Sequence, residues 1–385
     1  MNFYNSRYFV INQNLLKFLG LWPYQTKMTK ILIRMVITAS LIISIVPQII
    51  AAVQMRKNTD RLIIAVGTLV YIFGIGMKFF GVIFSESKLK FLYANMVKNW
   101  NMLKNETEKK ILEESSELGR LLTICYIGYM VPAGLLFLVL PFAYHIFDKS
   151  QPLMFVLEGE YFVDREEYYY PIYLFETFTI LASIPLIFTI DSTYAVCIQQ
   201  CIGLFDVVKQ RLACATEWNN KLKLISYRTN DAAYEAIIKS AELHEKVLNF
   251  SHILELSYSS SLLAVMIANV LVLAAAVVTI LLSFQKPVLL FRALLLSIGF
   301  TIHMFYLSWP GQKMIDSSND VFFAAYNNEW YNCSIECQKL LMFIMQRSME
   351  PFYFTAGGFY IMNMENFLLL FKSAMSYVTV LSSLT

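Results

Sequence analysis

The sequence predicts an all-α membrane protein, a single domain built as a bundle of seven transmembrane helices. The chain of 385 residues has a mean hydropathy of +0.53, and only 15% of its residues are charged. Soluble domains carry about 25% charged residues. Long apolar stretches alternate with charged ones. Each apolar stretch is long enough to cross a hydrocarbon core of about 30 Å. No internal repeat is evident.

Each predicted span is an apolar run bounded by charged residues. Before the first span, residues 1–30 are expected to place a short helix on the membrane, with Trp22 and Tyr24 at the interface. The stretches 204–247 and 311–349 are expected to continue as cytoplasmic helices. Within the single domain 1–385 the spans are predicted at 31–53, 62–84, 118–147, 171–203, 248–284, 288–310 and 350–385.

Glycine is frequent in the second predicted span. Gly67, Gly74, Gly76 and Gly81 all lie there. Glycine allows helix backbones in a membrane to approach closely. We therefore expect this span to pack tightly against a neighbouring helix.

Positive charge is distributed unevenly between the two sides of the bundle. Lysine and arginine concentrate in 1–30, 85–117, 204–247 and 311–349, which lie on one side of the predicted spans. The positive-inside rule then places the N-terminus in the cytoplasm and the C-terminus outside. A G-protein-coupled receptor has the reverse orientation, so that class is a weaker alternative.

The last span carries one polar line on an apolar helix. At about 100° per residue, Glu365, Lys372, Ser376, Thr379 and Ser383 fall within roughly 40° of one direction. Lipid penalises ionisable groups, so this line should face protein or water. The pattern favours a pore-lining helix. The alternative is that the hydroxyls bond to their own helix and the two charges lie near its ends.

No pattern of catalytic or metal-binding residues stands out. Cysteine pairs occur at i, i+4 in Cys197/Cys201 and Cys333/Cys337, but no histidine accompanies them at ligand spacing. We expect no enzyme activity, no metal and no cofactor. A transporter would use paired charges inside the membrane. Asp191, Glu365 and Lys372 are the candidates for such charges, but the lack of a repeat makes this a weaker alternative.

Several motifs resemble the insect odorant receptor family. The tail contributes Phe352-Tyr353-Phe354-Thr355-Ala356-Gly357, Phe371-Lys372-Ser373-Ala374 and Ser376-Tyr377-Val378-Thr379-Val380-Leu381. Upstream stand Gly76-Met77-Lys78-Phe79, which resembles the cytoplasmic end of the family's second helix, and Phe305-Tyr306, Gly311-Gln312-Lys313, Ala324-Ala325-Tyr326 and Trp330-Tyr331. The alternative family is that of the related gustatory receptors, whose tail motif matches this sequence less well.

The resemblance implies an odour-gated, non-selective cation channel in the plasma membrane of an olfactory neuron dendrite. In this family four subunits each contribute the seventh helix to a central pore. An odour-specific subunit assembles with a shared co-receptor, and a small volatile molecule is the ligand. This chain lacks the long insertion between spans four and five that marks the co-receptor, so it resembles a tuning subunit embedded in a lipid bilayer. No nucleic acid is expected as a partner.

The resemblance also assigns roles to individual residues. The gate would be Val380, and the pore lining would include Ser376, Thr379 and Ser383. Subunit contacts would involve Trp330, Tyr331, Leu340, Leu341 and Arg347. The ligand pocket would draw on spans two, three, four and six through Val70, Tyr71, Gly134, Leu138, Phe142, Phe175, Phe178, Thr179, Ile298, Gly299 and Ile302.

Overall fold

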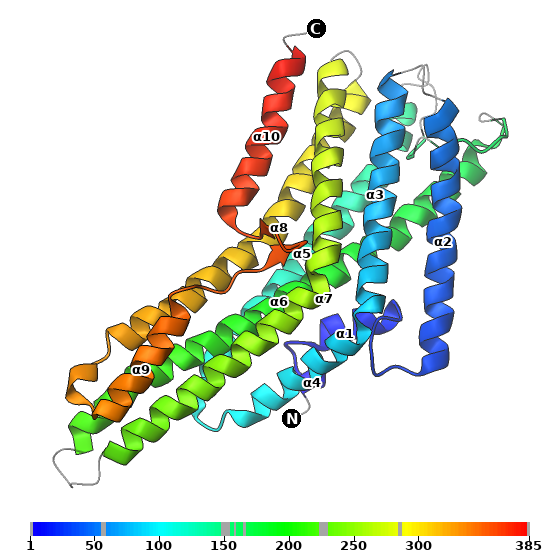
Figure 1. Ribbon diagram of the computed structural model, residues 1–385. Coiled ribbons are helices and arrows are strands. Elements are labelled where there is room, and N and C mark those ends of the chain that lie inside the picture. The colour runs from blue at the N-terminus through cyan, green and yellow to red at the C-terminus, as the bar shows by residue number, and fades with distance from the viewer. Residues whose placement is uncertain are drawn as a thin grey trace.

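Long apolar helices dominate the computed structural model, which describes residues 3–54, 59–147, 155–157, 159–164, 167–222, 230–283 and 287–382. Six described helices are long and apolar enough to cross a membrane, and α10 is added to them near the C-terminus. The predicted seven-helix class is confirmed (Figure 1). In chain order the elements are η1 (Phe3–Asn5), α1 (Val10–Phe18), α2 (Lys27–Gln54), α3 (Thr59–Phe84), α4 (Glu86–Met102), α5 (Glu106–Phe147), α6 (Tyr169–Leu222), α7 (Asn230–Leu282), α8 (Pro287–Tyr326), η3 (Trp330–Asn332), α9 (Ile335–Ser348), β1 (Thr355–Ala356), β2 (Tyr360–Ile361) and α10 (Met364–Ser382).

Three of the helices continue well beyond the bilayer. Helix α6 has 54 residues and α7 has 53, and at 1.5 Å per residue each is roughly 80 Å long. Helix α8 runs through the buried Pro310 to Tyr326. These two helices thus run past the predicted span ends at 203 and 310, into stretches that were expected to be helical. The parts of these helices beyond the bundle form a stem with α9 alongside, at the lower left of Figure 1.

The N-terminal segment is partly buried against the helices, and the predicted interfacial position of Trp22 is wrong, whereas Tyr24 is 44% exposed. Trp22 is only 3% exposed, and its ring stacks on Tyr93 of α4 at 5.3 Å between centroids. The amide of Asn12 donates to Ser192 Oγ at 2.9 Å. Trp22 therefore packs against α4, and Asn12 ties the segment to α6.

The predicted span 350–385 is wrong at its start. Its first residues form a hairpin of β1 and β2 instead of a helix. Gly357 and Gly358 have φ of 67° and 81°, a conformation that stops a right-handed helix. Helix α10 begins only at Met364, where the side-chain oxygen of Asn363 accepts from the backbone N of Asn366 at 2.8 Å.

The hairpin is anchored to α7 and α8. The backbone N of Thr355 donates to Glu255 of α7 at 3.2 Å, and Gly357 N donates to Ser259 O at 3.1 Å. On α8, a Cβ added to Gly311 would lie 2.0 Å from the carbonyl oxygen of Met362. These contacts fix the point from which α10 starts.

Helices α3 and α7 approach closely through small residues, as the glycine content of the second span predicts. Each glycine of one α3 face meets a small side chain of α7, and the nearest approach is 2.9 Å between an added Cβ on Gly81 and Ser261 Cβ. Gly76 lies off this face, and a Cβ there would meet no described atom within 4 Å. The pairs, at heptad spacing in both helices, are Gly67 with Ala275, Gly74 with Ala268 and Gly81 with Ser261.

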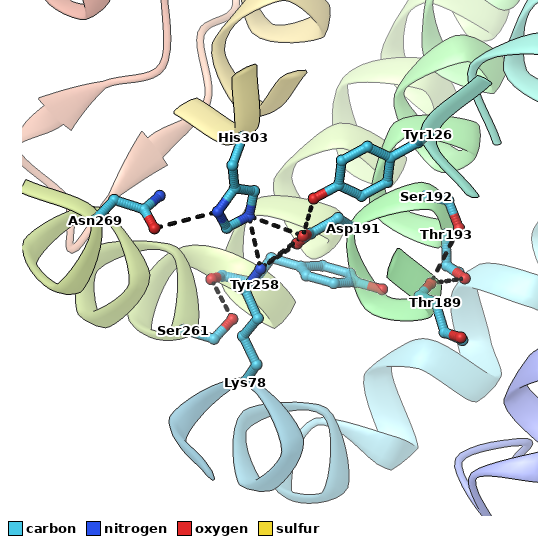
Figure 2. A network of polar contacts seen from close by, with 10 residues as sticks. All are labelled: Lys78, Tyr126, Thr189, Asp191, Ser192, Thr193, Tyr258, Ser261, Asn269 and His303. Atoms are coloured by element: carbon cyan, nitrogen blue, oxygen red, sulfur yellow. Dashed lines mark hydrogen bonds and ion pairs between the residues drawn. The ribbon is translucent and has the colours of Figure 1, made fainter. Parts of the chain in front are cut away.

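A buried polar cluster joins five helices (Figure 2). Lys78 Nζ lies 2.6 and 2.7 Å from the two carboxylate oxygens of Asp191, and the two residues are only 3% and 2% exposed. His303 Nε2 lies 2.9 Å from Asp191 Oδ2 and 3.1 Å from Lys78 Nζ. Tyr126 donates to Asp191 Oδ2 at 3.2 Å, and Asn269 Oδ1 lies 3.1 Å from His303 Nδ1. One residue each comes from α3, α5, α6, α7 and α8.

The α3–α7 contact predicts how two glycine substitutions will differ. Gly81→Val should lower the free energy of unfolding by about 1–3 kcal/mol, since overpacking forces the helices apart. Gly76→Val makes the same change in intrinsic helix propensity without the contact, so it serves as the matched control. Thermal unfolding of the detergent-solubilised protein measures both. Equal melting temperatures for the two variants would contradict the close packing.

The polar cluster predicts a partial rescue. Lys78→Met leaves the buried Asp191 without its cation, which should cost about 3–5 kcal/mol. Adding Asp191→Asn removes the orphaned charge while retaining a hydrogen-bond acceptor, so the double variant should melt higher than Lys78→Met alone. A double variant no more stable than the single one would show that the ion pair is not what holds the cluster.

Candidate functional site

A cavity of about 540 Å³ lies in the helix bundle. This volume is within the range of small-molecule sites, which are typically about 300–1,000 Å³. Most of the lining side chains are aliphatic or aromatic. The walls come from α3, α5, α6, α7 and α8 and include Ile64, Tyr71, Ile75, Met130, Phe137, Ile180, Ile184, Ile187, Val265, Val272, Leu289, Leu296 and Phe300.

The polar cluster forms one end of this cavity. Lys78, Asn269 and His303 belong both to the cluster and to the lining. Arg292, which also lines the cavity, precedes His303 on α8 by about three turns, or roughly 16 Å. The cavity therefore has a cluster end at His303 and a second end at Arg292.

A short loop segment, residues 155–157, closes the second end, which we call the loop end. Glu176 is 0% exposed, and its Oε2 accepts from the backbone N of Val156 at 2.8 Å and of Leu157 at 3.0 Å. Arg292 donates to the carbonyl oxygens of Phe155 at 3.1 Å and Val156 at 2.6 Å. Two charged side chains thus hold the loop over the cavity.

Two hydroxyls on the cavity wall are already bonded to their own helices. Thr68 donates to the carbonyl of Ile64 at 3.0 Å, and Thr279 donates to that of Ala275 at 2.8 Å. Neither hydroxyl is therefore free to donate to a ligand. With its mostly aliphatic and aromatic lining, the cavity is suited to a largely apolar molecule.

Four of the predicted ligand residues line this cavity: Tyr71, Gly134, Ile298 and Gly299. Their contact with a ligand remains a prediction. The other predicted ligand residues do not line the cavity, because they lie on faces of their helices that point away from it. Phe178 is 59% exposed on the outside of α6. The remaining six do not line the cavity either: Val70, Leu138, Phe142, Phe175, Thr179 and Ile302.

Sequence reasoning missed the wall that α7 contributes. Val265, Ala268, Asn269, Val272 and Ala276 all line the cavity. The signal that could have found this wall is the series of small residues on α7 that faces the glycines of α3. The reasoning also placed Lys78 at a helix end, although it pairs with Asp191 in the interior.

The predicted pore residues lie on α10 or beyond it. Ser376 is exposed, and its hydroxyl donates to the carbonyl of Lys372 at 2.9 Å, as the alternative to a pore line expects. Thr379 and Val380 belong to α10, but their side chains lie outside the described part of the chain. Ser383 lies outside the described residues altogether. Their role in a pore remains a prediction.

The predicted subunit-contact residues divide into exposed and buried ones. Trp330 and Tyr331 are 39% and 63% exposed, and Arg347 is also exposed. Leu340 is partly buried against the core of its own chain. Leu341 is 0% exposed, so it offers no surface to a partner and is removed from the predicted contacts.

Known proteins resemble this chain in sequence and in structure. The profile of the 7tm odorant receptor family matches residues 86–375. Odorant receptor 30a of Drosophila melanogaster is 31% identical over 75 residues, which are 20% of this chain and 20% of that receptor. Odorant receptor 85f of the same species is 27% identical over 123 residues, which are 32% of this chain and 31% of that receptor. The chain thus aligns with less than a third of the length of these relatives.

A solved structure extends the likeness to the whole fold. The olfactory receptor OR5 of Machilis hrabei in complex with eugenol superimposes with a TM-score of 0.80, covering 98% of this chain and 97% of that one. At 14% identity this likeness concerns the fold alone. The family profile, by contrast, spans most of the sequence. The chain therefore belongs to the 7tm odorant receptor family.

Proposed function

We propose that this receptor is the ligand-binding, odour-specific subunit of a non-selective cation channel, and that its ligand occupies the cavity of about 540 Å³. The cavity carries the proposal because five helices wall it, its lining is mainly apolar and its volume suits a small volatile molecule. The structurally similar OR5 was solved with eugenol, which supports a small ligand here.

The route from cavity to pore runs through the hairpin. Helices α7 and α8 both wall the cavity, and both hold the hairpin that precedes α10, through Glu255 on α7 and Gly311 on α8. A ligand that favours one arrangement of these helices therefore also favours one position of α10. The ligand acts only through its difference in affinity between the two states. A change from mostly closed to mostly open needs about 5.5 kcal/mol over all sites.

The proposed pore is lined by α10 in a tetramer. Val380 forms the apolar gate, and Ser376, Thr379 and Ser383 provide polar surface beside it. An apolar constriction blocks ions by dewetting, and a small widening lets water and ions pass.

The proposed partner is the co-receptor of the family, which contacts the stem on the cytoplasmic side of the plasma membrane. Around η3 and α9 the stem exposes several large apolar side chains, and an exposed apolar patch of this kind is typical of a protein interface. These side chains are Trp330, Tyr331, Ile335, Met342 and Phe343, at 39%, 63%, 66%, 54% and 62% exposure.

Whole-cell recording with a panel of volatile molecules that includes eugenol tests the ligand site and the channel together. Co-expression with the co-receptor should give odour-evoked cation current that persists when G-protein signalling is blocked. Gly299→Phe fills the cavity from α8 and should abolish the response or lower sensitivity at least tenfold. Leu294→Phe enlarges a side chain on the same helix that is 41% exposed and outside the lining, so it should respond like the wild type.

Two outcomes would contradict this proposal. Current that disappears when G-protein signalling is blocked would indicate a metabotropic receptor. Equal responses from Gly299→Phe and the wild type, at matched surface expression, would place the ligand outside the cavity.

The gate predicts a gain of basal current. Val380→Ser should raise cation current without ligand, because a polar side chain wets the constriction. Met375→Ser is the matched control, since it lies on the same helix about 140° away from residue 380. A Val380→Ser channel with normal surface expression and unchanged basal current would remove Val380 from the gate.

A further inference from the structure

One buried hydrogen-bond donor at the cavity has no partner. Asn269 is 2% exposed, and among the described residues nothing accepts a hydrogen bond from its Nδ2. Other buried side-chain atoms in the described part of the chain also lack partners, but Asn269 Nδ2 alone among them belongs to a residue that lines the cavity. An unpaired buried donor is costly, so a ligand that supplies an acceptor gains affinity there.

The hydrogen bonds within the polar cluster do not use the NH₂ group of Asn269. His303 Nδ1 lies 3.1 Å from Asn269 Oδ1. If the ring carries protons on both nitrogens, it donates to Asp191 and to Asn269 Oδ1. If it carries a proton on Nδ1 alone, Nε2 accepts from Lys78, which lies 3.1 Å away and can only donate. A proton on Nε2 alone would make Nδ1 an acceptor and would need the amide turned so that its NH₂ group faces the ring. In the structure Oδ1 faces Nδ1 instead, an orientation that fits a proton on Nδ1. Oδ1 is then occupied and the NH₂ group of Asn269 is not (Figure 2).

The other strong donors at the cavity are already engaged. Lys78 is held by both carboxylate oxygens of Asp191. Arg292 donates to carbonyl oxygens of the loop segment 155–157, and Thr68 donates to its own helix. Two tyrosine hydroxyls remain as rival donors, that of Tyr129, near Gly299, and that of Tyr71, which also lines the cavity.

We propose that Asn269 is the polar anchor of the ligand and that the receptor selects neutral molecules with an apolar body and one hydrogen-bond acceptor at one end, such as ketones, aldehydes or esters. The inference rests on the proposed ligand cavity. The acceptor enters at the cluster end, beside Asn269, and the apolar body extends toward the loop end. A carboxylate is disfavoured, because the cation of Lys78 is already neutralised by Asp191 and a second buried anion would be unpaired.

Matched probe pairs isolate this hydrogen bond. Acetophenone and α-methylstyrene differ by C=O against C=CH₂, as do 2-heptanone and 2-methyl-1-heptene. Apparent affinities come from the dependence of thermal stability of the detergent-solubilised full chain on probe concentration, which needs no channel opening. In the wild type the ketone of each pair should bind roughly 3–10-fold more tightly than its hydrocarbon.

The variants assign that preference to one side chain. Asn269→Leu should abolish the ketone preference, and Thr68→Val, which removes an engaged hydroxyl from the same cavity, should retain it. Asn269→Asp covers the case in which Asn269→Leu does not fold. It keeps an acceptor for His303 Nδ1 and replaces the free NH₂ group with oxygen, so it should also lose the preference.

The possible outcomes distinguish failure of Asn269 as the anchor from failure of the cavity as the ligand site. Equal binding of ketone and hydrocarbon to the wild type would overturn the anchor while the cavity stands as the ligand site. A preference that survives Asn269→Leu, or that disappears in Tyr71→Phe or Tyr129→Phe, would also overturn it. Failure of all four probes to stabilise the wild type would contradict the cavity as a ligand site and, with it, the anchor.

Discussion

The buried ion pair of Lys78 and Asp191 is the interaction on which the arrangement of the bundle depends. Two charges that are 3% and 2% exposed are tolerated only if each keeps its partner and its further hydrogen bonds. That requirement brings α3, α5, α6, α7 and α8 to one point, since each supplies one member of the cluster. The same five helices separate above this point and enclose the cavity. The cluster thus closes the bundle at one level and defines the polar end of the site.

The local sequence pattern was sufficient to predict the helices, but not to predict which residues pair between them. Apolar runs and the glycines of α3 are readable along the chain, and the predicted close contact of α3 exists. Lys78 and Asp191, however, are 113 residues apart. Nothing in the sequence around either residue identifies the other as its partner. The start of the last span was misplaced because the apolar composition outweighed Gly357-Gly358, although positive φ at both residues ends any helix there.

The lining of the cavity was predicted less well than the fold, because whether a residue lines the cavity depends on the rotation of its helix. Neighbouring residues differ by about 100°, so a correct depth with a small error in rotation selects the wrong face. Gly299 and Ile298 line the cavity, whereas Phe178 points outward at the depth chosen for it. The wall from α7 was omitted because its alanines suggest packing alone, and they do pack against α3.

The position of the cluster constrains the proposed coupling between a ligand and α10. Since separating Lys78 from Asp191 is costly, helices α7 and α8 are held to the cluster through Asn269 and His303. The hairpin contact at Gly311 lies about two turns, or roughly 12 Å, beyond His303 on α8. A ligand that spreads the helices on the cavity side of a fixed point tilts their far sides in the opposite direction. The hairpin lies on that far side, so in the proposed mechanism a tilt about the cluster displaces the start of α10 without breaking the ion pair.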